Sequence, residues 1–470
     1  MRFKNFTETE LNEQHLDVLR ALGRAIGVKS PTSKNKFQLI REIMAIRSGE
    51  MAAVMPAKKG APPKIEVDLS QFLITENDNP LGIMPVDRSL HFADCKKEAA
   101  DMTVEGIFED VQTYGFLRAN NFDNSADDAY MPPHLIRKYN VRRGDRVRAV
   151  AKFVKDNELP AIQNVISVNG CPTEDAEKRA NFDELVPCYP TEKLKLERVD
   201  DADMTARIID LFAPIGKGQR GLIVAPPKTG KTTLLKNVAK AIEQNYPKVK
   251  LIVLLVDERP EEVTDLKRSI KGEVVYSTFD ESAEHHVKIA ELVASRAKGL
   301  VEMGKDVVVL LDSITRLARA YNNVVESSGK VLSGGIDPTA LHGPKRFFGS
   351  ARNIENGGSL TVIATALVET GSRMDDVIYE EFKGTGNMEI HLSRALSERR
   401  IFPAIDLYKS GTRKEELLLS PSEIDAARKL RRILADKQDA ILNLTDVLQK
   451  TKGNEDLISK IDAWLKLFDK

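Results

Sequence analysis

The chain has 470 residues, of which 42% are hydrophobic and 30% charged, and its 70 Lys and Arg residues are balanced by 70 Asp and Glu residues. This length predicts two or three domains, and a formal net charge of zero argues against a protein that coats nucleic acid by charge alone. Three widely separated cysteines (Cys95, Cys171 and Cys188) suggest neither a metal site nor a disulfide framework, and without a span-length apolar run we expect a cytoplasmic protein.

Residues 1–48 are predicted to form a small helical domain. Two apolar stripes recur there at helical spacing, one through Leu16, Leu19, Leu22 and Ile26 and the other through Phe37, Ile40, Ile43 or Met44, and Ile46. A packing or tethering role and a nucleic-acid-binding role are both compatible with this pattern. Residues 49–100 lose the period and contain the stretch MPAKKGAPPK, which predicts a linker or insertion of low order.

Residues 101–170 are predicted to form a small barrel. They contain five short strand-like runs, which are TVEGIFEDV, YGFLRA, DAYMPP, DRVRAVAKFV and PAIQNVISV. This pattern suits a Greek-key barrel of the oligonucleotide-binding (OB), cold-shock-like kind, followed by a connector at 171–204. The two-residue strand period places Tyr114, Phe116 and Arg118 on one face, which Tyr130 extends. These aromatic rings form either a stacking platform for unpaired bases or part of the barrel core.

Residues 205–420 alternate apolar runs with helical stretches, which predicts a doubly wound parallel α/β domain. The runs are GLIVA, KLIVLLVD, EVVYSTF, DVVVLLD and LTVIATAL. Residues 421–470 are predicted to form a C-terminal helical subdomain that packs through Leu430, Ile433, Leu434, Ile461, Trp464, Leu465 and Phe468.

The first of these runs continues into a phosphate-binding loop. The stretch APPKTGKTT joins a buried strand to a helix, which is the context that this motif requires, although Ala225 stands where the strict pattern has Gly. Lys231 is predicted to pair with the β- and γ-phosphates of a nucleotide, and the Thr232 hydroxyl to hold Mg²⁺.

Two further strand ends supply carboxylates. Asp312 ends a buried run, where a parallel sheet positions its ligands, and is the predicted Mg²⁺ partner. Glu258 ends another run and is favoured as the group that orients the attacking water, with Asp257 as its rival. The predicted nucleotide-binding set is Lys228, Thr229, Gly230, Lys231, Thr232, Thr233 and Asp312.

Phosphoryl transfer also gains from a positive charge at the γ-phosphate, often an arginine from another subunit. The candidates that follow the sheet are Arg394, Arg399, Arg400 and Arg413, and their spacing does not choose between them. Two loops carry further cations, Lys330 in 325–337 and Arg373 in 369–376. They either track a phosphate backbone or are solvated connections.

Taken together, these motifs make the chain resemble the Rho family of bacterial transcription termination factors. The resemblance covers 103–420, loosely also 8–48, and rests on GQRGLIVAPPKTGKT, VDERPEEVTD, LLDSITRLARAYN, HGPKRFFGSARN, EEFKGTGNMEIHLSR and SGTRKEELL. It implies a homohexameric ring of RecA-like domains that uses ATP and Mg²⁺ as an RNA-dependent ATPase and helicase on nascent single-stranded RNA. It also implies RNA polymerase and a NusG-type elongation factor as partners, and no membrane.

The resemblance further implies residue roles. The implied catalytic residues are Lys231, Glu258, Arg413 as the arginine finger that reaches the neighbouring subunit, and Arg400 as a second trans-acting arginine. The implied phosphate and metal contacts are Lys228, Lys231, Thr232 and Asp312. The implied primary RNA site is Tyr114, Phe116, Arg118 and Tyr130, and Lys330 and Arg373 belong to the secondary RNA site around the central hole.

The sequence departs from the family pattern at two sets of positions and in the extra segment 49–100, which has no obvious counterpart. Position 373 is Arg where the family often has Lys, and Leu159 and Pro160 replace aromatic residues. Two rival functions remain from the residues alone. One is a catalytic subunit of a rotary ATP synthase, which also has a barrel before a similar domain, and the other is a non-enzymatic RNA-binding scaffold.

Overall fold

The computed structural model describes residues 11, 16–26, 28, 34–48, 102–153, 159–198, 203–434 and 440–468. The predicted linker at 49–100 and Cys95 lie outside these residues, as do the side chains of Phe37, Leu465 and Phe468. The chain divides into two compact units, Met1–Lys97 and Glu98–Lys470.

The first unit contains the two predicted helices. They are α2 (Leu16–Ile26) and α3 (Lys36–Ser48). The helical period gathers their apolar side chains on one side of each helix. The buried members of the predicted stripes are Leu19, Leu22, Ile40 and Ile43.

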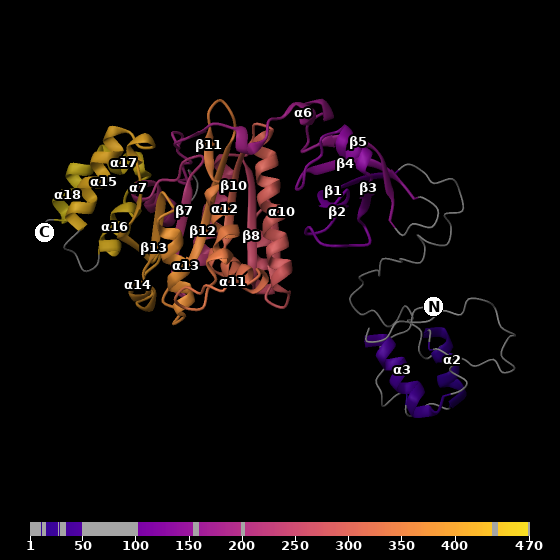
Figure 1. Cartoon of the computed structure of the whole chain (residues 1–470). Coiled ribbons are helices and arrows are strands. Elements are labelled where there is room, and N and C mark those ends of the chain that lie inside the picture. Colours follow the sequence, from indigo (N-terminus) through magenta and orange to yellow (C-terminus); the bar gives the residue numbers. More distant parts are fainter. Residues whose placement is uncertain are drawn as a thin grey trace. The chain divides into compact units, whose positions relative to one another are not determined.

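The second unit begins with a closed barrel of five strands (Figure 1). The strands are β1 (Met102–Val111), β2 (Tyr114–Arg118), β3 (Ala129–Met131), β4 (Arg146–Lys152) and β5 (Ala161–Val168), in the spatial order β1-β2-β3-β5-β4. A short helix, α5 (Pro133–Lys138), lies between β3 and β4 in the chain. The barrel core includes Phe108, Leu117, Met131 and Val147. The strands are the five that the sequence predicts, and closure of the barrel removes open sheet edges.

The α/β part is built on a nine-stranded sheet. Its main path is β14-β13-β7-β12-β10-β8-β9, and β11 (Arg352–Ile354) and β6 (Pro187–Cys188) continue beside β12. The bounds are β7 (Arg220–Ala225), β8 (Lys250–Glu258), β9 (Glu273–Thr278), β10 (Asp306–Asp312), β12 (Ser359–Leu367), β13 (Met388–Leu392) and β14 (Ile405–Thr412). β13 and β14 are additions to the predicted strands, because their side chains alternate between buried and partly exposed instead of forming an apolar run.

Helices cover both faces of this sheet (Figure 1). On one face are α7 (Met204–Phe212), α8 (Lys231–Asn245) and α9 (Pro260–Ser269); on the other are α10 (Ala283–Glu302), α11 (Ile314–Val324), α12 (His342–Gly349) and α13 (Arg373–Lys383). Successive residues of β7 point to opposite faces of the sheet. Leu222 packs with α10 to α13, and Ile223 packs with α7 to α9. The predicted doubly wound fold is therefore confirmed.

Shorter elements complete the second unit. They are α6 (Thr173–Lys178), α14 (Arg394–Glu398) and the 3₁₀ helices Phe182–Glu184, Pro338–Leu341 and Glu415–Leu417. The C-terminal helices are α15 (Pro421–Leu434), α16 (Ala440–Gln449), α17 (Asn454–Ser459) and α18 (Ile461–Phe468).

The C-terminal helices pack on α7, as the apolar pattern predicts. Leu430, Leu434 and Ile461 join the same buried cluster as the helices on that face of the sheet. Arg207 of α7 is buried among these helices and donates to Asn454 Oδ1 at 3.1 Å and to the Leu448 carbonyl oxygen at 2.6 Å. The second of these hydrogen bonds satisfies a backbone carbonyl in the last turn of α16.

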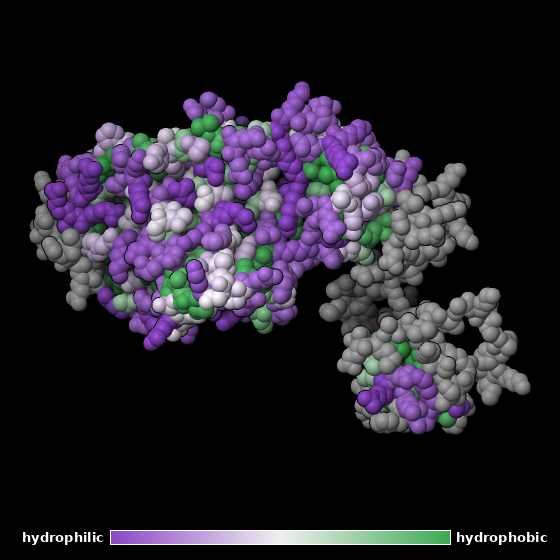
Figure 2. Space-filling view, in the orientation of Figure 1, coloured by the Kyte–Doolittle hydropathy of each residue, from purple (hydrophilic) through white to green (hydrophobic). Residues whose placement is uncertain are grey.

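The surface of the second unit is largely hydrophilic in the view of Figure 2, with apolar residues in small separate groups. In the described part of the chain, no helix combines the length and the apolar character needed to cross a membrane.

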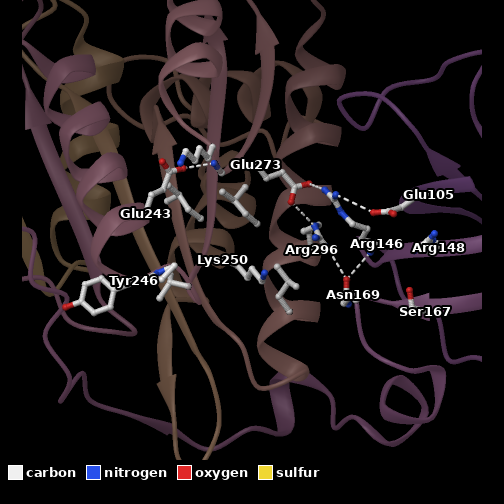
Figure 3. Close-up of a pocket in the computed structure, with 18 residues that line it drawn as sticks. Glu105, Arg146, Arg148, Ser167, Asn169, Glu243, Tyr246, Lys250, Glu273 and Arg296 are labelled. Atoms are coloured by element: carbon white, nitrogen blue, oxygen red, sulfur yellow. Dashed lines mark hydrogen bonds and ion pairs between the residues drawn. The ribbon is translucent and has the colours of Figure 1, made fainter.

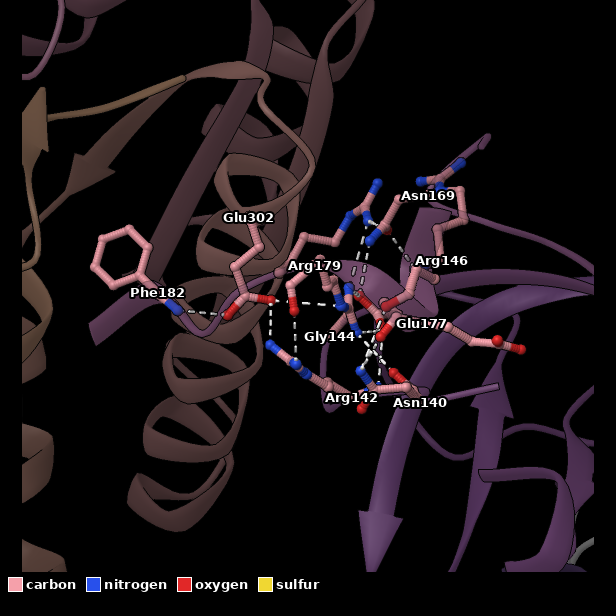
Figure 4. A network of polar contacts seen from close by, with 12 residues as sticks. Asn140, Arg142, Gly144, Arg146, Asn169, Glu177, Arg179, Phe182 and Glu302 are labelled. Carbon is pink, nitrogen blue, oxygen red and sulfur yellow. Dashed lines mark hydrogen bonds and ion pairs between the residues drawn. The ribbon is translucent and has the colours of Figure 1, made fainter. Parts of the chain in front are cut away.

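A buried network of charges docks the barrel on α10 (Figure 4). Arg179 donates to both carboxylate oxygens of Asp145, at 2.8 and 2.5 Å, and both residues are buried. Glu302 of α10 accepts from Arg142 Nη1 and from the Phe182 backbone N–H, each at 2.9 Å. Because each buried charge has a partner, removal of one partner would leave the other uncompensated.

Gly144 allows the barrel to approach α10 closely. Its φ is +85°, and a Cβ atom at this position would lie 2.3 Å from the backbone nitrogen of Arg296. Gly170 has a similar φ of +77°, but a Cβ atom there would meet nothing within 4 Å. The two positions therefore share the backbone strain of a substitution and differ in the contact with α10.

We expect Gly144→Ala to weaken the docking of the barrel much more than the matched substitution Gly170→Ala, because only the first adds a backbone clash. Thermal unfolding and the rate of proteolysis within the connector 171–204 measure this. Equal losses in the two variants would contradict a packing role for Gly144.

Candidate active site and nucleic-acid interface

The phosphate loop runs from the end of β7 at Ala225 to the start of α8 at Lys231. Lys228 and Gly230 have φ of +66° and +88°, and Thr229 Oγ1 donates to the Pro226 carbonyl oxygen at 2.7 Å. No side chain caps the N-terminus of α8. The first N–H groups of this helix are therefore available to an anion.

Lys231 lies between two buried carboxylates. Its Nζ is 3.0 Å from Glu258 Oε1 and 2.5 Å from Asp312 Oδ1. Burial alone would lower the pKa of Lys231, but the two carboxylates outweigh it and raise the pKa. We name Lys231, Glu258 and Asp312 the ion cluster. It is charged and desolvated beside the loop, as a phosphate site requires.

Of the two rival carboxylates after β8, Glu258 belongs to this cluster and Asp257 does not. Glu258 is 2% exposed, and its second oxygen lies 3.3 Å from Arg316 Nη1. The Asp257 side chain is 40% exposed, and its oxygen is 3.9 Å from Arg316 Nε. The geometry favours Glu258 as the carboxylate that faces the nucleotide.

Two oxygen groups in this region fit a magnesium ion. Asp312 Oδ1 accepts from Thr365 Oγ1 at 2.7 Å, whereas Asp312 Oδ2 is buried without a hydrogen-bond partner. Thr232 at the start of α8 offers a hydroxyl oxygen. Carboxylate and hydroxyl oxygens are the donors that Mg²⁺ prefers, and an ion would satisfy the unpartnered oxygen.

A cavity of about 580 Å³ lies beside the loop. It is lined by Lys228 of the loop, by Thr233 in the first turn of α8, and by Phe402 and Pro403. The Phe402 ring is 50% exposed and offers an apolar face. The size and lining suit a nucleotide base.

A larger cavity of about 840 Å³ lies at the junction of barrel and sheet (Figure 3). Arg146, Lys250, Glu273 and Arg296 are among the residues that line it. Lys250 and Glu273 begin β8 and β9, at the end of the sheet opposite the phosphate loop. The larger of these two cavities therefore lies away from the phosphate loop and the ion cluster.

The predicted trans-acting arginines lie at opposite ends of the sheet. Arg413 directly follows β14. Thr412, the last residue of β14, pairs with Met388 of β13, and Met388 in turn pairs with Gly221 near the start of β7. Since β7 rises about 3.3 Å per residue toward the loop, Arg413 is on the far side from its own Lys231. Arg400 follows α14 at the loop end, where it is exposed with φ of +60°.

The aromatic residues of the barrel form a cluster on its surface. Ring centroids are 5.8 Å apart for Tyr114 and Phe116, 5.7 Å for Tyr114 and Tyr130, and 6.1 Å for Phe116 and Tyr130. All three side chains are partly exposed, and the apolar core is built from other residues. The structure therefore favours a surface platform over a core role.

Arg118 lies beneath this platform and is not free. Its guanidinium carbon is 4.9 Å from the Phe116 ring centroid, and its Nη1 donates to Asp128 at 2.6 Å and its Nε to Glu109 at 2.5 Å. At 8% exposure, it supports the Phe116 ring, while its charge is satisfied within the barrel.

The two predicted cationic loops touch each other. A Cβ atom on Gly334, in the loop of Lys330, would lie 2.6 Å from the backbone nitrogen of Met374, the residue after Arg373. Both cations are exposed. Asp375, in the first turn of α13, is held by Arg319 through contacts of 2.8 and 2.7 Å.

Several contributors to the site were not predicted from the sequence. Arg316 follows Asp312 by four residues and Glu262 follows Glu258 by four, and each lies in the first turn of the helix that comes after the strand of that carboxylate. That spacing is a signal that could have found them. No sequence spacing indicates Phe402. It lines the cavity because the segment between α14 and β14 passes beside the phosphate loop.

Two family models match the chain. One, described as ATP synthase alpha/beta family, nucleotide-binding domain, matches residues 205–412. The other, described as Rho termination factor, RNA-binding domain, matches residues 104–174. The boundaries of the two matches follow the sheet domain and the barrel.

Curated relatives extend this similarity over most of the chain. Transcription termination factor Rho of Bacillus subtilis is 54% identical over 375 residues, covering 78% of this chain and 88% of the relative. The factor of the same name from Cereibacter sphaeroides is 54% identical over 376 residues, covering 78% and 89%.

Among solved structures, a prototypical ATPase from the type III secretion system of pathogenic bacteria aligns with a TM-score of 0.50. The identity is 24%, over 60% of this chain and 88% of that chain. At this identity the likeness shows a shared fold only.

We expect Phe116→Ala to weaken binding of single-stranded RNA by about 1–3 kcal/mol, because it removes one stacking ring and leaves the barrel core intact. Titration of a labelled oligocytidylate at fixed salt measures this. The control is Phe153→Ala, since Phe153 is an exposed aromatic residue of the same barrel outside the cluster. Equal affinities of the two variants would argue against the platform.

Proposed function

The chain belongs to the Rho family of transcription termination factors, and from this premise we propose that its ATPase is switched on by RNA and drives a homohexameric ring along the transcript as a helicase. Membership of this family already establishes that the chain binds RNA in transcription termination and that it contains an ATPase domain. The RNA dependence, the helicase activity and the ring are the proposal.

In the ATPase reaction, each member of the ion cluster has a separate role. Lys231 pairs with the β- and γ-phosphates, and Glu258 orients the attacking water. Mg²⁺, held by Thr232 and Asp312, supplies charge neutralisation of the phosphates when it is bound. Binding of the phosphates would draw Lys231 away from the carboxylates, which frees Glu258 for the water.

Helix α11 contacts both proposed sites, and these contacts support the proposal most directly. Arg316 near its start contacts Glu258 at 3.3 Å, and Arg319 one turn later holds Asp375 at 2.8 and 2.7 Å. Asp375 follows Arg373, which we propose contacts RNA in the central hole together with Lys330. A shift of that loop is thus transmitted by one rigid element to the catalytic carboxylate.

The position of Arg413 supports hydrolysis between subunits. Because it lies at the far end of the sheet from its own phosphate loop, it can serve a nucleotide only in a neighbouring copy of the chain. We propose Arg413 as the arginine finger and Arg400 as a second trans-acting arginine. Heterologous contacts of this kind form a ring when the rotation between neighbouring copies closes.

The barrel captures RNA by stacking unpaired bases on Tyr114, Phe116 and Tyr130. The family's task further suggests RNA polymerase and a NusG-type elongation factor as partners and the cytoplasm as the place of action.

Neither rival function explains the combination of sites as well. The likeness to other ring ATPases is one of fold, while the relatives at 54% identity are termination factors. A non-enzymatic scaffold would have no use for the buried ion cluster, which costs desolvation energy to maintain.

We expect Lys231→Ala to abolish RNA-stimulated ATPase activity while RNA binding by the barrel stays near normal. The control is Lys236→Ala, because Lys236 lies on the same helix and pairs with Asp265 at the surface, 2.9 Å away. ATP hydrolysis with and without polycytidylate measures the effect. Hydrolysis in the unchanged protein that ignores polycytidylate would contradict the proposal.

Mixing two inactive variants tests the trans arginine. We expect Arg413→Ala alone to lower activity by about 10³-fold or more. Rings assembled from this variant together with Lys231→Ala contain interfaces with both an intact Lys231 and an intact Arg413. Activity of the mixture should therefore exceed the sum of its parts; no recovery would indicate that Arg413 acts within its own subunit.

A further inference from the structure

We propose that Glu262 is a positioning residue for the magnesium ion, acting through the hydroxyl of Thr232. The inference rests on the proposed ATPase function and adds a residue to that site. Its basis is one hydrogen bond, in which Thr232 Oγ1 donates to Glu262 Oε2 at 3.0 Å.

The direction of this hydrogen bond decides what the hydroxyl can offer. A threonine hydroxyl has one proton and two lone pairs, and an ionised carboxylate only accepts. Glu262 therefore fixes the Thr232 proton on its own side. The lone pairs of Thr232 remain for a cation.

The position of Glu262 is set by the fold. It is the third residue of α9, which begins at Pro260 directly after β8, and its backbone N–H donates to the Arg259 carbonyl oxygen at 3.0 Å. A carboxylate in the first turn is favoured by the helix dipole. The first turn of α9 thus faces the first turn of α8, and Glu262 meets Thr232 across that gap.

A second observation points to a cation at the same place. Asp312 Oδ2 is buried without a hydrogen-bond partner, and both Asp312 and Thr232 flank Lys231, the first through an ion pair and the second as its chain neighbour. One ion contacted by both oxygen groups would explain the unpartnered oxygen. The role of Glu262 is then that of an outer contact, which in metal sites typically contributes a factor of about 10–100 in affinity.

The chain provides a matched control in the preceding residue. Glu261 is in the same first turn and carries the same charge, but it is exposed. No hydrogen bond or ion pair of its side chain is found within the described residues. Substitution of Glu261 by Ala removes the same charge from the same helix end as substitution of Glu262, but it does not remove the contact with Thr232.

The test compares Glu262→Ala, Glu262→Gln and Glu261→Ala in the full-length protein. The readouts are the affinity for Mn²⁺, followed by electron paramagnetic resonance with a non-hydrolysable ATP analogue present, and the affinity for a fluorescent ATP analogue in Mg²⁺ or in EDTA. We expect E262A to lower the Mn²⁺ affinity about tenfold or more. Nucleotide affinity in EDTA should stay unchanged, and E261A should match the unchanged protein.

The Gln variant separates a hydrogen bond from charge. Its amide oxygen can still accept from Thr232, so E262Q should retain more Mn²⁺ affinity than E262A. Normal Mn²⁺ affinity in E262A, an equal loss in E261A, or an equal loss of nucleotide affinity in EDTA would each overturn the inference. If instead the unchanged protein bound the nucleotide no better with Mg²⁺ than in EDTA, the assignment of the ATP site itself would fail.

Discussion

The contact of Lys231 with two buried carboxylates is the interaction on which the active site depends. Three chain segments meet there, because β7, β8 and β10 are parallel and their carboxyl ends share one edge of the sheet. Glu258 and Asp312 would be costly as isolated buried charges, and Lys231 compensates both. In the proposed function the same lysine binds the phosphates, so one side chain would both stabilise the empty site and contribute affinity for the nucleotide.

The direction of the edge strand has an equally general consequence. β14 runs antiparallel to β13, which carries Arg413 to the end of the sheet away from the phosphate loop. If Arg413 is the arginine finger that we propose, a single copy of the chain holds an incomplete set of catalytic groups. In the proposed ring, copies joined head to tail would bring Arg413 of one copy to the phosphate loop of the next.

The barrel and the sheet form one compact unit because their junction is both charged and closely packed. Asp145 and Arg179 neutralise each other inside it, and Gly144 admits the backbone of α10 at a distance that a side chain would prevent. The aromatic cluster then faces outward while Arg118 braces it from below, paired with Glu109 and Asp128. The aromatic cluster and the ion cluster thus lie in separate parts of one compact unit.

The sequence by itself determined the strands of the barrel, the central strands of the sheet, the phosphate loop and the carboxylates at strand ends, because each depends on residues close together in the chain. Local pattern could not show which of Glu258 and Asp257 contacts Lys231, or whether Phe116 lies in the core or on the surface. It also could not show that Arg118 is neutralised, or that Glu262 reaches Thr232. Those outcomes depend on which distant segments face each other, since burial and ion pairing are set by packing across strands and helices, and only the tertiary structure decided them.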